Sequence, residues 1–274
     1  MRMRERPATA VRARSALLAL AVTLALAACS GNSSELSNLA TPDGASSSSA
    51  FPGSDEQSRS ASSVPAFGDI PDGTSGGRQV IENPTNADIM ATGTLPEMSL
   101  GRSDAPVTII KYASLTCPHC RAFHRDVFPE LKRTYIDTGK VRFILREFPI
   151  GLQSGTATVA WRCAPADKYF ELYGKFLEQQ GRWVSQEVRR DPIFEVAKQV
   201  GMTRQQFDAC YENQAMIDGL KWVKERGRQL GIIGTPNFFV AGKLVKETLT
   251  MAGIRERVDP LLGGPRSAAA GIAQ

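Results

Sequence analysis

The motif Cys117-Pro118-His119-Cys120 has the residue types and the spacing for thiol–disulfide chemistry. Two cysteines separated by two residues can close an intramolecular disulfide, and a thiolate is the species that attacks another disulfide. We assign Cys117 as the nucleophile and Cys120 as the resolving thiol. His119, when protonated, adds a positive charge beside Cys117. Pro118 falls in a first helical turn, where its missing N–H costs nothing. These four are the predicted catalytic residues.

The sequence around the motif predicts a strand before it and a helix after it. Residues 107–113 are rich in β-branched side chains, as buried strands are. Cys117 would therefore lie at a helix N-terminus, where unpaired N–H groups and the helix dipole stabilise a thiolate. Apolar side chains recur after it at helical spacing, at Cys120, Phe123, Val127, Leu131 and Tyr135.

A zinc site and a purely structural disulfide are the alternatives for two cysteines at this spacing. Zinc needs four ligands, and the only histidines, His119 and His124, both lie in or near the motif. The downstream cysteines, Cys163 and Cys210, are each isolated in the sequence. A structural disulfide would leave the helix N-terminus unused. We therefore expect no metal and no organic cofactor, because the cysteine pair is itself the redox group.

The first 28 residues predict an export signal. An arginine-rich start precedes an apolar run over residues 16–28, which is too short to span a bilayer. The run ends in Leu26-Ala27-Ala28-Cys29, which resembles the lipobox of bacterial lipoproteins. That resemblance implies cleavage before Cys29 and a lipid anchor on its sulfur; an ordinary signal peptide with an incidental Cys29 is the alternative. Either way we expect a periplasmic, cell-envelope protein that contacts a membrane through the anchor only, in a leaflet left open.

Residues 29–95 predict a disordered tether. Thirteen serines lie between Ser30 and Val64, and few apolar residues recur at any period, so this stretch cannot form a core. The net charge of +5 does not indicate a nucleic-acid partner. Five arginines and one glutamate in the first 28 residues supply +4 of it.

The rest of the chain predicts an α/β domain with a helical middle. We expect a first half over residues 96–152, helices over 153–231, a second half over 232–264 and a flexible tail over 265–274. The first half reads as a βαβ unit with a parallel strand pair, and the second half as a hairpin and a helix. Strands are expected at 107–113, 141–148, 237–240 and 243–245, with a short edge strand near 98–100 and a last helix over 251–262.

Three local signals predict how helices begin or bend. Pro129 should kink the motif helix in its later half, before Gly139 ends it. Asp191 followed by Pro192 has the form of an N-cap and first helical residue. Thr203, with Gln206 three residues later, has the form of a capping box.

Two motifs together resemble the DsbA family of thioredoxin-fold thiol–disulfide oxidoreductases, over about residues 98–262. Gly234-Thr235-Pro236-Asn237-Phe238-Phe239-Val240-Ala241-Gly242 follows the cysteine motif after some 115 residues. The surroundings of Cys163 and Cys210 resemble the alphaproteobacterial branch. The resemblance implies a thioredoxin-like fold, a central mixed sheet flanked by helices, with a helical domain inserted. It also implies that Thr235 and Pro236 bind substrate, with a cis Pro236 facing the cysteine pair; a strand-start proline is the alternative.

The sequence departs from this family at Lys111, six positions before Cys117, where DsbA proteins often carry an acidic residue. A buried lysine would shed its charge or find a partner such as Glu147. His124 stands where some relatives have an acid, and we interpret it as a packed or surface histidine. Some relatives have a second disulfide in the insert, which implies a Cys163–Cys210 bridge; two buried free thiols are the alternative.

We expect an exported oxidoreductase that introduces disulfides into substrate proteins through Cys117 and Cys120. Its substrates would be unfolded or reduced exported proteins, and the family resemblance implies reoxidation by a DsbB-type, quinone-linked membrane partner. One alternative is a periplasmic reductase or isomerase on the same scaffold, kept reduced by a DsbD-type partner. The other is a lipid-anchored, chaperone-like binding module.

Overall fold

A five-stranded mixed sheet lies at the centre of the structure, a computed structural model that describes residues 80–263. The strand order is β1-β3-β2-β4-β5, and only β2 and β3 run parallel. The predicted βαβ unit and hairpin are thereby confirmed. The strands are β1 Ser99–Leu100, β2 Val107–Ala113, β3 Val141–Glu147, β4 Asn237–Val240 and β5 Lys243–Val245.

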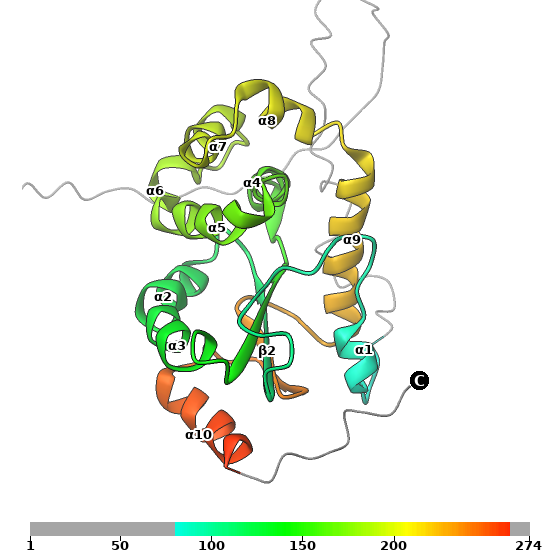
Figure 1. Cartoon of the computed structure of the whole chain (residues 1–274). Helices are drawn as coiled ribbons and strands as arrows, with labels where there is room; N and C mark the ends of the chain where they lie inside the picture. The colour runs from blue at the N-terminus through cyan, green and yellow to red at the C-terminus, as the bar shows by residue number, and fades with distance from the viewer. Residues whose placement is uncertain (1–79, 264–274) are drawn as a thin grey trace, which may run out of the picture. The chain divides into compact units, whose positions relative to one another are not determined.

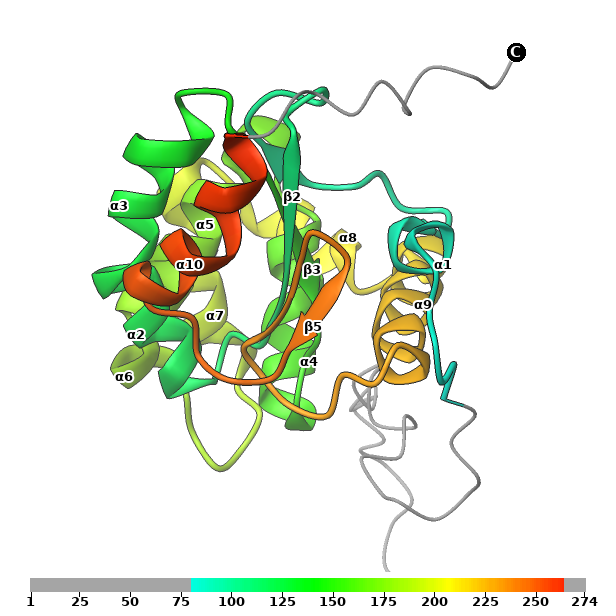
Figure 2. The same ribbon diagram turned by 90° about the horizontal axis from the view of Figure 1, so that it is seen from below.

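Strand β2 lies in the middle of the sheet, and its side chains are buried on both faces. Ile109 and Lys111 face one layer of helices, while Ile110 and Tyr112 face the other, as the two-residue period of a strand requires. Figure 2 shows α10, α2 and α3 on one side of the sheet and α1 and α9 on the other. Helix α10, Met251–Leu262, has the predicted bounds and buries Ile254 and Val258.

The predicted motif helix is divided into three segments. Helix α2 covers Pro118–Asp126, with Val127 as its C-cap. Helix α3 covers Phe128–Leu131, and a π-helical turn covers Lys132–Ile136. The break lies two residues before Pro129, because proline lacks an N–H and its ring clashes with the carbonyl four residues earlier. The expected kink at Pro129 is therefore a break between two helices.

The helices between β3 and β4 gather beyond one end of the sheet, and the last of them, α9, runs back along its face (Figure 1). A disulfide joins Cys163, directly after α4, to Cys210 at the end of α8, with 5.9 Å between their Cα atoms. The helices are α4 Gly151–Arg162, α5 Tyr169–Glu178, α6 Gln180–Trp183, α7 Arg190–Ala197, α8 Arg204–Cys210 and α9 Gln214–Gln229.

One of the two predicted starts within this helical region is correct. The capping box of Thr203 and Gln206 opens α8 as expected. Helix α7, however, begins at Arg190, so Asp191 is not its N-cap. The Asp191 carboxylate instead accepts a hydrogen bond of 2.7 Å from Arg204, and Pro192 stays in the first turn, where its missing N–H is harmless.

A short helix lies within the segment that was expected to be a tether up to residue 95. Helix α1, Asn86–Met90, is capped by Thr85 and buries Ile89. Arg226 donates to the Asp88 carbonyl at 2.9 Å, which attaches α1 to α9. No apolar period marks this segment in the sequence, because its attachment depends on one buried side chain and on hydrogen bonds to distant residues.

Several predicted features lie outside the described residues. These are the export signal over 1–28, the anchor Cys29, the tether up to residue 79 and the tail over 265–274. Within residues 80–263, no helix combines the length and the apolar character needed to cross a membrane.

Candidate functional site

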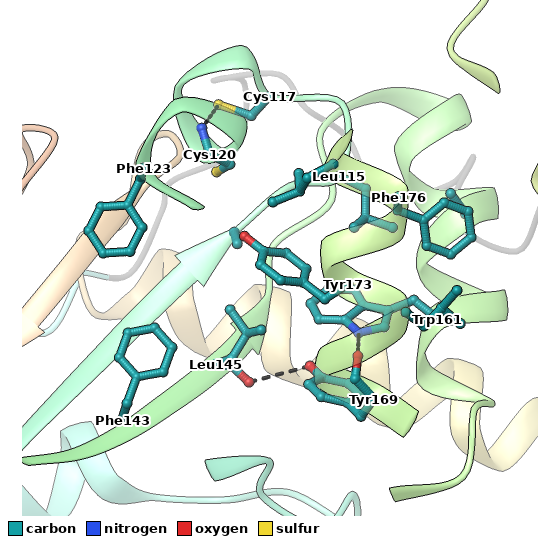
Figure 3. Close-up of a cluster of buried hydrophobic side chains, with 14 of the residues drawn as sticks. Leu115, Cys117, Cys120, Phe123, Phe143, Leu145, Trp161, Tyr169, Tyr173 and Phe176 are labelled. Carbon is teal, nitrogen blue, oxygen red and sulfur yellow. Dashed lines mark hydrogen bonds between the residues drawn. The ribbon is translucent and has the colours of Figure 1, made fainter. Parts of the chain in front are cut away.

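Cys117 caps the N-terminus of α2 with its own sulfur. Its backbone is extended, and its Sγ accepts a hydrogen bond from the Cys120 N–H at 3.4 Å (Figure 3). Pro118 is the first residue of the helix, so no N–H is lost there. Cys117 and Cys120 are both free thiols in this structure. The predicted strand-to-helix position of the motif is what creates this geometry.

The pKa of Cys117 is lowered to about 5. Hydrogen bonding by the Cys120 thiol is the largest cause, with further contributions from the Thr235 side chain and from the backbone N–H groups of Cys120 and His119; burial opposes them. A thiolate therefore predominates at neutral pH. Cys117 is 9% exposed, enough for another sulfur to approach it.

Cys120 has the opposite environment. It is fully buried, and burial is the largest cause that raises its pKa well above that of a free thiol, with the adjacent Cys117 adding to the effect. Lys111 acts against the increase. One thiol of the pair is thus ionised and reachable, while the other is protonated and enclosed.

Thr235 lies directly beside Cys117, although 118 positions separate the two residues. The Cys117 thiol donates a hydrogen bond of 3.0 Å to the Thr235 carbonyl oxygen, and the Thr235–Pro236 peptide is cis. Strand β4 begins at the next residue and pairs with β2. The sheet therefore brings the two sequence motifs together, with His119 exposed in the first turn of α2.

The helical region also contacts residues 114–117, the loop that leads into α2 (the cysteine loop). Sequence reasoning missed these contacts. Gln180 on α6 is 6% exposed and donates to the carbonyl oxygens of Leu115, at 2.7 Å, and Cys117, at 3.2 Å. The hydroxyls of Ser114 and Ser154 lie 2.7 Å apart. Neither contact leaves a local sequence signal, because each joins segments at least 40 residues apart.

Lys111 is buried beneath α2, but Glu147 is not its partner as expected. The Lys111 ammonium donates a 3.0 Å hydrogen bond to the Tyr173 hydroxyl and lies 4.2 Å from the centre of the Phe123 ring. Glu147 instead pairs with Arg162 at 3.0 Å. Arg162 is the last residue of α4, so the helical region supplies the counter-charge for Glu147.

His124 packs one turn below Cys120. Its ring stacks on Phe128, with 5.4 Å between centres, and meets Tyr173 edge-on at 5.5 Å. Burial, aided by the charge of Lys111, lowers the pKa of His124 to about 4. His124 is therefore neutral at physiological pH and acts as an aromatic packing residue.

Metal ligation was the main alternative for the cysteines. Across residues 80–263, no group of three or more histidine, cysteine, aspartate or glutamate side chains is arranged to hold an ion.

The sheet order, the helix-capping cysteine and the proline loop beside it define a thioredoxin-fold protein with a large helical insertion. The family model described as Thioredoxin matches residues 94–260. Since that match covers more than half of the sequence, the chain belongs to the thioredoxin family.

Curated relatives have related names. A Rickettsia bellii protein named "Putative protein-disulfide oxidoreductase" is 32% identical over 151 residues, which are 53% of this chain and 57% of that protein. Bacillus subtilis "Disulfide bond formation protein D" is 26% identical over 173 residues, 60% of this chain and 77% of that protein. This chain spans 53% to 62% of the length of the Rickettsia relatives it matches.

Solved structures agree with the fold. Wolbachia pipientis alpha-DsbA1 has a TM-score of 0.59 at 26% identity, covering 65% of this chain and 96% of that one. Oxidised BdbD from Bacillus subtilis has a TM-score of 0.57 at 22% identity, covering 69% and 100%. The expected DsbA-type fold, a mixed sheet with a helical insertion, is confirmed.

Proposed function

We propose that this protein is an exported thiol–disulfide oxidoreductase that introduces disulfides into reduced proteins. The observation that carries the proposal is the position of Cys117 as the N-cap of α2, where its sulfur accepts from the Cys120 N–H at 3.4 Å and its pKa is lowered. A stabilised Cys117 thiolate stabilises the reduced protein, which makes the Cys117–Cys120 disulfide a better oxidant. The names of the curated relatives and the likeness to alpha-DsbA1 support the same activity.

The proposed reaction begins with the Cys117–Cys120 disulfide. A substrate thiolate attacks the Cys117 sulfur, the bond to Cys120 breaks, and its electron pair leaves on Cys120. A second substrate thiolate then attacks the substrate sulfur of the mixed disulfide, and Cys117 leaves as a thiolate. The substrate loses two electrons and gains a disulfide, and the protein is reduced by the same two electrons.

The residues around Cys117 support separate roles. The exposed edge of the Cys117 sulfur suits attack, and the backbone of Thr235 and Pro236, 3.0 Å away at its carbonyl, suits an extended substrate chain. His119 is exposed beside the nucleophile, where a protonated ring would favour the thiolate. Cys163 and Cys210 are bridged away from this site and serve stability.

The cellular setting is part of the proposal. An export signal over residues 1–28 would place the domain in the envelope, lipid-anchored through Cys29, where disulfides persist. Continued oxidation of substrates requires an acceptor for the two electrons. By family resemblance, we assign this role to a membrane oxidase linked to quinone.

Oxidative refolding tests the function. The purified full-length protein, oxidised and in catalytic amount, is added with glutathione disulfide to a reduced, unfolded protein whose activity requires its disulfides. We expect faster recovery of activity than with glutathione disulfide alone, and no acceleration by Cys117→Ala. Reduction of a disulfide-bonded protein without oxidation of the reduced one would instead identify a reductase or isomerase. Prevention of aggregation that persists in Cys117→Ala, without redox turnover, would identify a binding module.

A further inference from the structure

A buried lysine lies under the cysteine pair, and the proposed reaction does not yet use it. Lys111 is 1% exposed. Within residues 80–263, no carboxylate lies within ion-pair distance of its ammonium, whose polar contact is the Tyr173 hydroxyl at 3.0 Å. A buried ammonium with no anion beside it is costly, and a nearby negative charge would offset that cost.

The geometry indicates which charge that is. Lys111 faces α2 from β2, and its ammonium lies 4.2 Å from the Phe123 ring centre and 5.3 Å from that of Tyr173. Phe123 is one turn after Cys120 on the same buried face of α2. In Figure 3, the Tyr173 hydroxyl that binds Lys111 points toward the cysteine motif. The ammonium therefore lies between the sheet and the helix that carries both thiols.

The titratable groups that face Lys111 come from two elements. Helix α2 provides Cys117, Cys120 and His124, and α5 provides Tyr173. His124 is neutral near pH 7, and burial raises the pKa of Tyr173, which keeps its hydroxyl protonated. Burial is also the largest influence on Lys111, lowering its pKa to about 8, while the charges of Cys120 and then Cys117 oppose the decrease. The thiolates are thus the anions that can balance this lysine.

We infer that Lys111 is the buried counter-charge and proton donor for the Cys120 thiolate that forms when the Cys117–Cys120 disulfide opens. The inference rests on the proposed oxidase function and adds the partner of the leaving sulfur. It also gives this site a cationic group in the position where the DsbA family often carries an acid.

The proton and electron balance is complete. When a substrate thiolate bonds to Cys117, the electron pair of the broken bond goes to Cys120. The neighbouring ammonium stabilises that anion and gives it a proton, leaving a neutral amine and a Cys120 thiol. The amine regains a proton from solvent. During reoxidation the ammonium first returns a proton to solvent, and the resulting neutral amine takes the Cys120 proton, so that the Cys120 thiolate can attack the mixed disulfide at Cys117.

The test is the thiol–disulfide equilibrium of Lys111→Met, which keeps the apolar stem and removes the charge. Full-length wild type and variant are equilibrated with glutathione of known redox ratio at pH 7, and free thiols are trapped by acid and alkylation. The equilibrium constant for reduction of the Cys117–Cys120 disulfide should fall about tenfold, the order expected for one unit charge acting across a protein interior. The midpoint of the Cys117 thiolate titration should also rise.

A second variant keeps the inference testable if Lys111→Met does not fold. Tyr173→Phe removes only the oxygen that accepts from the ammonium, so it should shift the same equilibrium in the same direction by a smaller factor. A lysine that merely packs on Phe123 predicts no shift in either variant, and that result would overturn the inference.

The two proposals can fail separately. An unchanged glutathione equilibrium in Lys111→Met, with wild-type protein still oxidising substrates, rejects the role of Lys111 and keeps the oxidase. A tenfold shift in a protein that oxidises no substrate supports the role of Lys111 and rejects the oxidase.

Discussion

The Cys117 thiol donates a hydrogen bond to the carbonyl oxygen of Thr235, 3.0 Å away. Cys117 is the N-cap of α2, the first helix after β2. Thr235 lies two residues before β4, the antiparallel neighbour of β2. The carbonyl can accept from a thiol but not from a thiolate. Ionisation of Cys117 therefore breaks this contact.

The ionisation of Cys117 should be visible directly. In the reduced protein, thiolate absorbance near 240 nm should develop with a midpoint near pH 5, because hydrogen bonds to the sulfur outweigh its burial. Cys117→Ala should lose this transition. Cys120→Ala should keep it at a higher pH, since the Cys120 thiol is the largest cause of the lowered pKa. A wild-type midpoint near pH 9 would contradict the assignment of Cys117 as the nucleophile.

The stability of the reduced protein should depend on pH through the same thiol. The pKa of Cys117 is about 5 when folded and about 9 as a free thiol, so between these values the unfolded state binds more protons. Stability therefore rises with pH across this window, is fully gained above pH 9 and is lost as pH falls through 5. Urea unfolding of reduced wild type and Cys117→Ala should give curves that diverge from pH 5 to 9. Parallel curves would show that Cys117 titrates normally.

The sequence predicted the sheet strands because each carries a signal of its own. Residues 107–113 are β-branched and continuous, as a doubly buried strand must be, and the predicted span matches β2 residue for residue. Helix α10 was likewise delimited by its local pattern. At Asp191 the local signal was overridden, because Arg204, 13 residues away, engages the carboxylate that would have capped α7.

The sequence predicted those site residues that belong to its two motifs. The cysteine pair and the Thr235–Pro236 segment were identified from sequence, and family resemblance joined them. Gln180 could not be identified, because a glutamine in a short helix has the same pattern whether it faces solvent or a backbone carbonyl. Glu147 was named as a possible partner of Lys111, but it pairs instead with Arg162 from the helical region, a contact that leaves no local sequence signal.

Loss of the Cys163–Cys210 disulfide should destabilise the protein without silencing the site. The bridge closes a loop with a sequence separation of 47, for which the chain-entropy model gives about 4 kcal/mol. The double variant Cys163→Ala, Cys210→Ala should therefore unfold at lower urea concentration, while its glutathione equilibrium stays close to wild type. A changed equilibrium constant would mean that the bridge also shapes the active site.

Removal of Gln180 should loosen the cysteine loop from the helical region. Gln180→Ala leaves the buried Leu115 carbonyl without its 2.7 Å donor, which should cost about 1–3 kcal/mol of unfolding free energy. The reaction of oxidised protein with glutathione should slow as well. Gln179→Ala is the matched control, because Gln179 bonds only the exposed Gln199 side chain at 2.9 Å. Equal effects of the two substitutions would show that Gln180 does not position the loop.

Gly174 on α5 should tolerate no larger side chain while His124 is present. A Cβ at this position would lie 2.9 Å from His124 Nε2, and the ring cannot swing away because Phe128 and Tyr173 enclose it. Overpacking should outweigh the better helix propensity of alanine, so Gly174→Ala should lose about 1–2 kcal/mol of stability. Urea unfolding measures the change.

Two comparisons separate the clash from a general effect of alanine. Gly181→Ala on α6 has no atom within 4 Å of its new Cβ, so it should be neutral or stabilising by up to about 1 kcal/mol. In a His124→Ala background the clash is absent, and the Gly174→Ala penalty should disappear, since contacting sites are not additive. A penalty that persists without the His124 ring would mean that the closeness of α2 and α5, and not this ring, requires the glycine.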